Sequence, residues 1–191
     1  TIGDLNFFEK ILASYFQSVT LRTAGFNTVP LGSLRDATIF ISCILMFIGA
    51  SPGSTGGGIK TTTFGVIMFY VIGIAKKKGN IEVFNRRIDW EILNRALAIL
   101  VIAITYVAFI ITCILVIEDF TMEQVVFEVI SAFGTVGLTL GITPQLSVLS
   151  KLLIIITMFI GRLGPLTFAL AIGETKKKAI SKYPKENILV G

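Results

Sequence analysis

Long apolar runs dominate the pattern of hydrophobic and polar residues along the chain. Two of them, at residues 92 to 117 and 146 to 173, each exceed the roughly 20 residues that an α-helix needs to cross a bilayer, so both are predicted to span a membrane. A third apolar region is interrupted from Ala50 to Lys60 by one proline and several glycines, which disfavours a continuous helix there. The pattern therefore predicts an all-α membrane protein with one broken helix.

Two shorter helical segments, residues 6 to 21 and 122 to 134, precede connectors that contain Pro30 and Pro144. At 1.5 Å per residue these helices would rise only about 20 to 25 Å, which is less than the roughly 30 Å of the hydrocarbon core. They are therefore predicted to enter and leave the membrane on one face.

The chain contains an internal repeat. Thr23-Ala24-Gly25-Phe26-Asn27 matches Thr135-Val136-Gly137-Leu138-Thr139, and Met46-Phe47-Ile48-Gly49 is identical to Met158-Phe159-Ile160-Gly161, with the same offset in sequence number for both matches. Two ungapped matches at one offset indicate a duplicated unit of short helix, Thr-x-Gly turn, connector and long apolar helix ending in basic residues. Because both units run in the same direction, the pattern favours a channel-like architecture over the inverted repeats of many secondary transporters.

The repeat divides the chain into four regions. Residues 1–78 form the first unit, whose leading helix would have to lie upstream of residue 1, and residues 92–175 form a complete second unit. Residues 79–91 form a linker whose interspersed apolar side chains predict an amphipathic helix on the cytoplasmic surface, with Trp90 at the interface. Residues 176–191 form a basic cytoplasmic tail.

Composition and charge support a multi-pass membrane protein. With 53% hydrophobic and 15% charged residues, the chain is too apolar for an ordinary soluble domain. The net charge of +5 does not indicate nucleic acid as a partner, because most basic residues lie in two segments that directly follow apolar stretches. Both segments are predicted to be cytoplasmic, although two solvated charge runs without topological meaning are the alternative. Their basic residues are Lys76, Lys77, Lys78, Arg86, Arg87 and Arg95, and then Lys176, Lys177, Lys178, Lys182 and Lys185.

The chain has no histidine, which removes the commonest general base and the commonest metal ligand. An enzyme is therefore not predicted. Cys43 and Cys113 lie in apolar runs, where a free cysteine packs as a small hydrophobic residue, so the sequence predicts neither a disulfide nor a protein-held metal or covalent cofactor.

The two Thr-x-Gly turns are the candidate ion-binding elements. A loop that re-enters the membrane exposes main-chain carbonyls, which is tolerated only where they line water or replace an ion's hydration shell. Gly25 and Gly137 lack a Cβ and can take the positive φ that turns successive carbonyls toward one axis, so four such loops could enclose a dehydrated potassium ion. The alternative is that each Thr-x-Gly marks an ordinary helix C-cap followed by a turn.

Two segments resemble a known family. Ser18-Val19-Thr20-Leu21-Arg22-Thr23-Ala24-Gly25-Phe26-Asn27 resembles the third pore loop of the Ktr/Trk/HKT superfamily of potassium transporters, and Gly49-Ala50-Ser51-Pro52-Gly53-Ser54-Thr55-Gly56-Gly57-Gly58-Ile59-Lys60-Thr61 resembles its third-repeat gate segment. The resemblance covers essentially the whole chain and is closest to the C-terminal half of the bacterial Ktr-type membrane subunit. It implies potassium-channel-like helix, pore-loop, helix repeats around one pore, two of an expected four being present here.

The resemblance also implies a selectivity filter and an intramembrane gate. The filter would comprise Thr23, Ala24, Gly25, Phe26, Thr135, Val136, Gly137 and Leu138, with potassium at the main-chain carbonyls of Thr23, Ala24, Gly25, Thr135, Val136 and Gly137. The gate would comprise Ala50, Ser51, Pro52, Gly53, Ser54, Thr55, Gly56, Gly57 and Gly58, together with Lys60 and Arg162. A Pro/Gly kink that only adjusts packing is the alternative for the broken helix.

Three cationic residues near these elements carry separate predictions. Arg162 lies inside the last apolar helix, where an arginine costs roughly 2.5 to 3.5 kcal/mol on insertion scales, so it is predicted to face polar surroundings. The repeat places Arg162 opposite Ala50, where it would pair with gate-loop carbonyls and repel cations. The alternative is that Arg162 is a structural partner for a buried carboxylate or a helix end. Lys60 is predicted to extend to the cytoplasmic interface. Arg22 stands where the second unit has Gly134 and is predicted to anchor the filter rather than to steer ions.

The glycine-rich segment also superficially resembles the phosphate-binding pattern Gly-x-x-x-x-Gly-Lys-Thr. Ile59 separates Gly58 from Lys60, and no strand precedes the segment, so the amides and the lysine would not be in register to hold a nucleotide.

The function implied by the resemblance is potassium uptake across the bacterial cytoplasmic membrane, with sodium or proton coupling left open. It further implies that the membrane subunit forms a homodimer and that each subunit has an N-terminal half with the first two repeats. The dimer would rest on a cytosolic ring, and nucleotide would bind to this ring alone. Residues 76 to 78, the linker and the tail are candidate contacts with this ring, or with anionic membrane lipid alone. An alternating-access cation symporter that uses the broken helix as its binding site, and a membrane scaffold without flux, are the alternatives.

Overall fold

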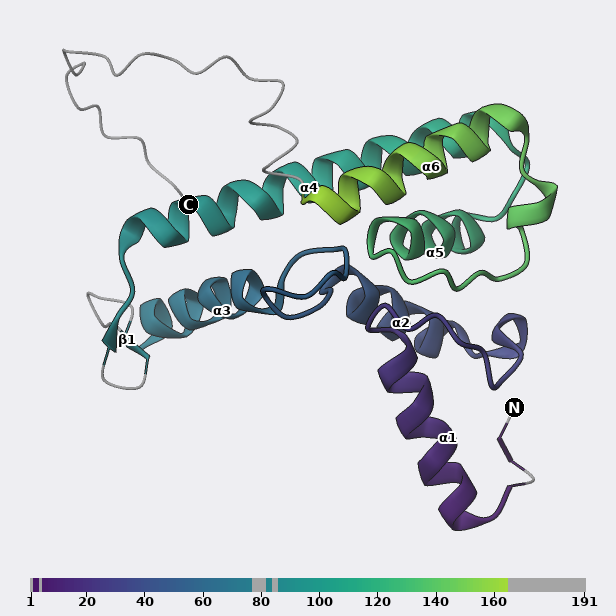
Figure 1. Cartoon of the computed structure of the whole chain (residues 1–191), viewed down its shortest axis with the longest axis horizontal. Coiled ribbons are helices and arrows are strands. Elements are labelled where there is room, and N and C mark those ends of the chain that lie inside the picture. The colour runs from purple at the N-terminus through teal and green to yellow at the C-terminus, as the bar shows by residue number, and fades with distance from the viewer. Residues whose placement is uncertain (1, 4, 77–81, 84–85, 165–191) are drawn as a thin grey trace.

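The computed structural model describes residues 2–3, 5–76, 82–83 and 86–164 of the 191-residue chain (Figure 1). Regular structure within these residues is mostly helical, as the hydrophobic pattern predicts. The elements in chain order are α1 (Phe7–Thr20), the 3-10 turn η1 (Leu31–Ser33), α2 (Asp36–Phe47), α3 (Thr61–Ala75), β1 (Glu82–Val83), β2 (Arg86–Arg87), α4 (Trp90–Ile117), α5 (Met122–Phe133), the 3-10 turn η2 (Thr143–Gln145) and α6 (Val148–Leu163).

The two predicted spanning helices are described to different extents. α4 covers 28 residues and, within the described ranges, is the one helix long and apolar enough to cross a membrane. Most of its side chains are not buried inside the structure, which leaves them available to lipid. The helix predicted at residues 146 to 173 is described as α6, and residues 165 to 173 lie outside the described part of the chain.

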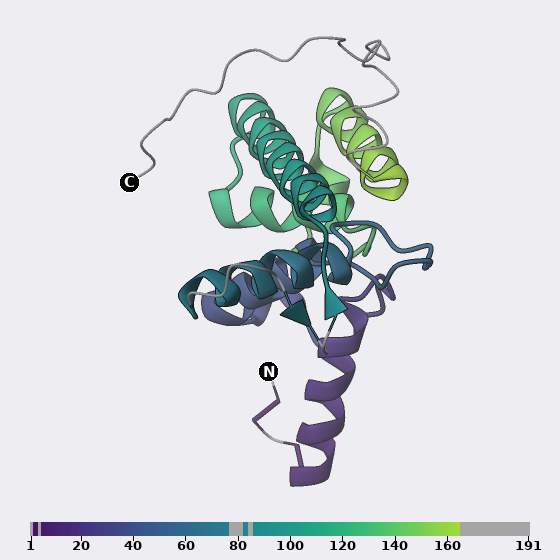
Figure 2. The ribbon, with the colours of Figure 1, turned by 90° about the vertical axis from the view of Figure 1, so that its left-hand side faces the viewer.

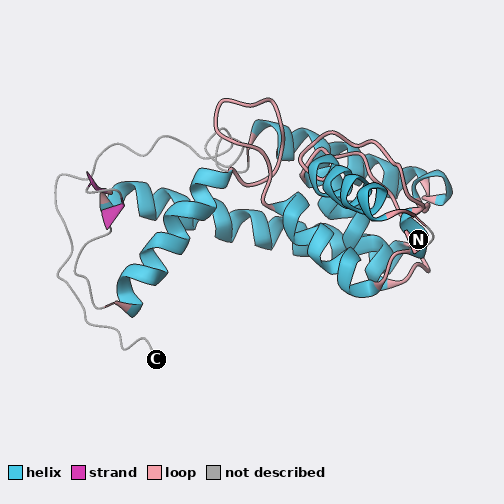
Figure 3. Ribbon diagram, turned by 90° about the horizontal axis from the view of Figure 1, so that it is seen from below, coloured by secondary structure: helices cyan, strands magenta, loops and turns pink. Residues whose placement is uncertain are grey.

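The apolar region before Lys76 is broken, as predicted. α2 ends at Phe47 and α3 begins at Thr61, and no helix lies between them (Figure 3, where this segment is a long pink loop). Gly53 and Gly58 in this segment have φ of +79° and +76°, values that residues with a Cβ rarely adopt. The glycine content therefore matches the backbone that the chain takes here.

The internal repeat appears in the positions of the secondary structure. η1 and η2 begin at Leu31 and Thr143, and α2 and α6 begin at Asp36 and Val148, so both pairs show the same offset as the matching sequence segments. The short helices α1 and α5 precede these elements in the same order. The duplicated sequence thus folds into duplicated local structure.

α5 lies at the centre of the packing. Figures 1 and 2 show α4 and α6 side by side above it, and α5 contacts α2 as well as both of these helices. One apolar core joins α4, α5 and α6 around Phe133 and takes in Ile59 from the broken segment. A second core joins α2 to the two Thr-x-Gly regions around Met46, Phe127 and Val136. The turns are therefore supported from both units.

α1 projects away from the other helices (Figure 2). Its exposed apolar side chains include Phe7, Phe8, Ile11, Leu12 and Tyr15. Burying one such side chain contributes about 1.5 to 3 kcal/mol, and apolar faces of this size usually mark a surface that a partner or lipid covers.

The described part of the linker is not the amphipathic helix that the sequence predicts. Glu82–Val83 and Arg86–Arg87 form two antiparallel strands, with Glu82 opposite Arg87. Strand pairing wins here because an isolated helix of this length is marginal in water. Trp90 is the first residue of α4, and its ring packs edge-on against Tyr70 with 5.6 Å between centroids.

Glu118 connects the end of α4 to the beginning of α6. Its Oε1 accepts a hydrogen bond of 2.8 Å from the backbone N–H of Ser147. Hydrogen bonds from Ser150 and Ser147 lower the pKa of the Glu118 carboxyl group below its ordinary value. Negative charge at this point is also favoured by the N-terminal dipole of α6.

Candidate functional site

Both Thr-x-Gly turns contain two left-handed residues. Thr23 and Gly25 have φ of +68° and +75°, and Thr135 and Gly137 have φ of +53° and +89°. A left-handed conformation strains a β-branched residue such as threonine, so the surrounding structure must hold it. An ordinary helix C-cap needs one left-handed residue, whereas each turn here has two that are separated by one residue. The backbone is therefore more specialised than a simple cap.

The two turns lie in direct contact. A Cβ added to Gly25 would lie 2.2 Å from the carbonyl oxygen of Val136 and 4.0 Å from the Cα of Gly137. The first distance is far below van der Waals contact, so only glycine allows this approach. Two turns that belong to different repeat units are therefore side by side in the structure.

The side chains that flank Gly137 point into the protein. Val136 and Leu138 are 5% and 2% exposed and pack in the core that contains Met46 and Phe127. Gly137 itself borders a cavity of about 210 Å³. Burial of the neighbouring side chains leaves the main chain as the chemically accessible part of this turn.

The broken segment folds back along its own beginning. Ile48 and Ile59 pair in a parallel bridge, in which the N–H of Gly49 donates to the Ile59 carbonyl at 2.8 Å and the N–H of Ile59 donates to the Phe47 carbonyl at 3.0 Å. A Cβ on Gly49 would lie 1.9 Å from the carbonyl oxygen of Gly57, so the return also depends on glycine. The intervening residues form a closed loop at the break between α2 and α3.

The glycines of this loop contact the threonines of both turns. The backbone N–H of Gly57 donates to Thr135 Oγ1 at 2.9 Å. A Cβ on Gly56 would lie 2.7 Å from Thr23 Oγ1, so the loop backbone is packed against that hydroxyl too. Thr23 Oγ1 is buried and has no hydrogen-bond partner among the described residues. The broken segment thus lies directly against one end of the paired turns.

Comparison with known proteins decides the family. The family described as "TrkH: Cation transport protein" matches residues 1–182. This chain is a member of the TrkH family of cation transport proteins. Membership confirms the kinship with the Ktr/Trk transporters that the sequence indicates.

Three relatives show how much of a family member this chain represents. Ktr system potassium uptake protein B of Bacillus subtilis is 46% identical over 191 residues, which cover 100% of this chain and 43% of that protein. The protein of the same name from Vibrio alginolyticus is 39% identical over 100% of this chain and 42% of its own length. The potassium/sodium uptake protein NtpJ of Enterococcus hirae is 38% identical over 97% of this chain and 42% of its own length. The chain therefore spans less than half the length of these TrkH-family relatives.

The Lys60 side chain of this TrkH-family chain turns back onto its own loop, and its predicted extension to the cytoplasmic interface stays a prediction. Its Nζ donates to the carbonyl oxygens of Gly56 at 2.6 Å and Ser54 at 3.2 Å. A broken helix leaves carbonyls without N–H partners, and an ammonium group with three donors can satisfy several of them. Lys60 therefore holds together the loop from which it emerges.

Arg162 follows Gly161, which lies close to the broken segment, but the predicted pairing of Arg162 with that segment stays a prediction. A Cβ added to the neighbouring Gly161 would lie 2.0 Å from the carbonyl oxygen of Phe133. The same oxygen accepts a hydrogen bond of 3.1 Å from the backbone N–H of Gly58 in the broken segment. The Arg162 side chain is exposed, and within the described residues it makes no hydrogen bond to carbonyls of the broken segment. The donor that these carbonyls receive comes from Lys60 instead.

Arg22 connects the first turn to the end of α2. Its Nη1 donates to the carbonyl oxygens of Ile48 and, at 3.1 Å, of Gly49. These carbonyls end the helix and begin the broken segment. The contact fits an anchoring role, although the sequence does not reveal that the partner is the start of the broken segment.

Two polar residues that hold the turns are missing from the sequence-based prediction. Glu128 is buried on α5 and accepts hydrogen bonds from the hydroxyls of Thr139, at 2.7 Å, and Thr143. Thr20 is buried at the end of α1 and donates to the Phe26 carbonyl at 2.7 Å. A carboxyl group within an apolar helix is costly unless it is partnered, and this was the signal available for Glu128.

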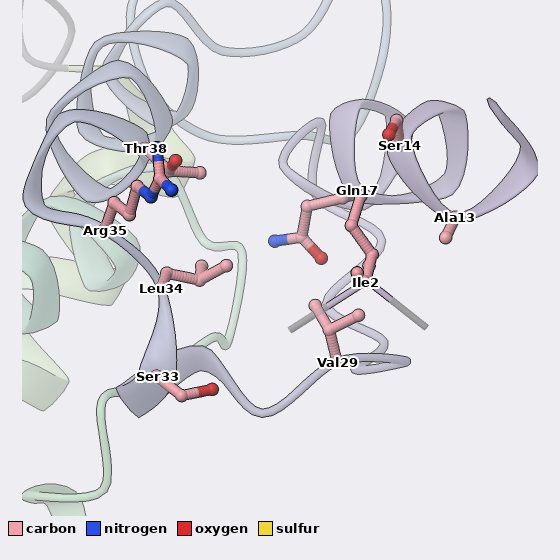
Figure 4. A pocket seen from close by; sticks show the side chains of 10 residues that line it. Ile2, Ala13, Ser14, Gln17, Val29, Ser33, Leu34, Arg35 and Thr38 are labelled. Atoms are coloured by element: carbon pink, nitrogen blue, oxygen red, sulfur yellow. The ribbon is translucent and has the colours of Figure 1, made fainter. Parts of the chain in front are cut away.

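A cavity of about 580 Å³ lies between α1 and the segment that follows the first turn (Figure 4). Gln17 points into it from α1, and Arg35 and Thr38 lie across from it. Both polar side-chain atoms of Gln17 are buried without a hydrogen-bond partner among the described residues. Buried amides are nearly always partnered, so water or another segment is expected to complete this region.

If the loop restrains ion passage in the full-length protein, replacing Lys60 by methionine should raise rubidium uptake about two- to fivefold, because methionine keeps an apolar stem but lacks the Nζ that makes both hydrogen bonds. Lys151→Met is the matched control, since Lys151 is an exposed lysine on α6 whose Nζ donates to a carbonyl outside the loop, that of Pro144. Equal uptake in both variants would show that Lys60 does not restrain the loop.

Proposed function

We propose that this chain is the C-terminal half of a potassium uptake protein and that its two Thr-x-Gly turns form half of a carbonyl-lined selectivity filter. The observation that carries this proposal is the contact between two equivalent left-handed turns, with Gly25 closely packed against the Val136 carbonyl. The printed names of the relatives from Bacillus subtilis and Vibrio alginolyticus, both potassium uptake proteins, support potassium as the ion.

Potassium would exchange its hydration shell for main-chain oxygens of the turns. The proposed ligands are the carbonyls of Thr23, Ala24, Gly25, Thr135, Val136 and Gly137, with equivalent oxygens from two further repeats. α1 and α5 both end just before these turns. The C-terminus of a helix carries about half a negative elementary charge, which favours a cation at this position.

The loop of the broken helix would act as the gate. It lies against the threonines of both turns, where its backbone would obstruct an ion leaving the filter. In this proposal the structure represents the closed arrangement. A hydrogen bond such as that between Gly57 and Thr135 contributes only about 0.5 to 1.5 kcal/mol, so a regulatory partner could break the few that hold the loop.

The proposed assembly requires segments outside this chain. An N-terminal half with the first two repeats would cover the exposed apolar face of α1 and the cavity beside Gln17. We further propose a multi-pass subunit in the bacterial cytoplasmic membrane that forms a homodimer on a cytosolic nucleotide-binding ring. The basic residues 76 to 95 and the tail would face this ring and anionic lipid in the cytoplasm. The tail lies outside the described residues.

Uptake by the full-length protein tests the proposed function. Bacteria without potassium uptake of their own, expressing the full-length protein and its ring subunit, should regain growth at low potassium and take up rubidium. Failure of these bacteria to grow at low potassium, with the protein present in the membrane, would contradict the proposal. A fixed stoichiometry between potassium and a second ion at transporter-like rates would instead favour an alternating-access symporter.

A further inference from the structure

Glu128 holds the part of the second turn that follows Gly137. Its Oε2 accepts a hydrogen bond of 2.7 Å from Thr139 Oγ1, and its Oε1 accepts one from Thr143 Oγ1. Thr139 directly follows the proposed filter residues, and Thr143 begins η2. One buried side chain on α5 therefore fixes two points of the backbone that leaves the filter.

The carboxyl group also lies close to the proposed ion ligands. Glu128, Thr135, Gly137 and Thr139 line the same cavity of about 210 Å³. Glu128 is only 6% exposed, and a buried carboxyl group is costly unless its oxygens are hydrogen-bonded. Its two hydroxyl donors supply these bonds, so the cluster is a complete unit built behind the turn.

The first unit holds its turn in a different way. The positions in the first unit that are equivalent to Glu128, Thr139 and Thr143 carry Phe16, Asn27 and Leu31, which cannot form this cluster. There the Thr20 hydroxyl donates directly to the Phe26 carbonyl at 2.7 Å. The two turns thus share a backbone conformation but not the side chains that maintain it.

We propose that Glu128 is a positioning residue for ion selectivity, which keeps the carbonyls around Gly137 at the spacing that potassium requires. A backbone fixed at Thr139 and Thr143 cannot readily contract around the smaller sodium ion. Loss of the cluster lets the turn contract and admits sodium. This inference rests on the proposed function, because it presupposes that the turn binds ions.

The test compares rubidium and sodium uptake by the full-length protein carrying Glu128→Gln or the paired change Thr139→Val and Thr143→Val. The paired change removes both donors and should lower the rubidium-to-sodium uptake ratio about three- to tenfold. Glu128→Gln keeps the shape and one acceptor, so it should lower the ratio less. Glu123→Gln, an exposed glutamate on the same helix, is the matched control and should leave the ratio unchanged.

The uptake ratio separates positioning from a merely structural role, because loss of folded protein lowers the uptake of both ions together. If Glu128→Gln does not reach the membrane, the single change Thr139→Val, which leaves the carboxyl group one donor, decides the question. An unchanged ratio in variants that still take up rubidium would overturn the inference and leave the proposed function intact. An unmutated protein with no preference for rubidium over sodium would refute the proposed function itself.

Discussion

Gly25→Ser is expected to lower the preference for potassium over sodium by about tenfold or more in the full-length protein. The new Cβ would lie 2.2 Å from the carbonyl oxygen of Val136, a proposed ligand, and would stand on a residue with φ of +75°. The neighbouring turn must move, and the strain of a left-handed residue with a side chain adds about 1 kcal/mol or more. Competition between rubidium and sodium in uptake assays measures the change.

Gly137→Ser separates the effect of backbone strain from the effect of a steric clash with the neighbouring turn. Gly137 has φ of +89°, but a Cβ there meets nothing within 4 Å among the described residues. We therefore expect this variant to admit sodium as well, with a smaller effect than Gly25→Ser. Gly65→Ser on α3, where space is open and φ is ordinary, is the control for glycine replacement. Undiminished potassium preference in both turn variants would contradict the filter assignment.

Deleting residues 53 to 58 is expected to raise rubidium flux about tenfold. The deletion removes Gly57, which donates to Thr135, and Gly58, which donates to the Phe133 carbonyl. It also removes the backbone that is packed against Thr23 Oγ1. With few hydrogen bonds of about 0.5 to 1.5 kcal/mol each holding the loop, their joint loss should leave the pathway open.

The control for this deletion is Thr55→Ala, which changes an exposed residue of the same loop and keeps the glycine donors. Its flux should match that of the unmutated protein. A deletion variant that reaches the membrane and takes up rubidium at the unmutated rate would show that the loop does not gate.

The local backbone around the turns and the break was predictable from the sequence. A positive φ at Gly25 and Gly137 follows from the repeated Thr-x-Gly pattern, and the end of α2 follows from the proline and glycines after Ala50. Both features depend on residues that are close together in the chain. The repeat then placed η2 and α6 once η1 and α2 were known.

The contacts between distant segments were not predictable in the same way. Lys60 was expected to extend to the interface, because nothing local shows that the loop returns over its ammonium group. The pairing of Gly57 with Thr135 joins two repeat units, and it arises only when both units pack against α5. Glu128 has no equivalent in the first unit, so a repeat-based comparison passes over it. The two strands of the linker are held by cross-strand pairing. A helix with a similar apolar pattern is the competing structure, and the sequence pattern favours that helix.

The most direct measurement of the central claim is a structure of the full-length protein, determined with rubidium or thallium in place of potassium. The account predicts ion density on one axis, coordinated by main-chain oxygens of Thr135, Val136 and Gly137 and by those of the turn around Gly25. Carbonyls of these residues that point away from every bound ion, or that pack against lipid, would contradict it.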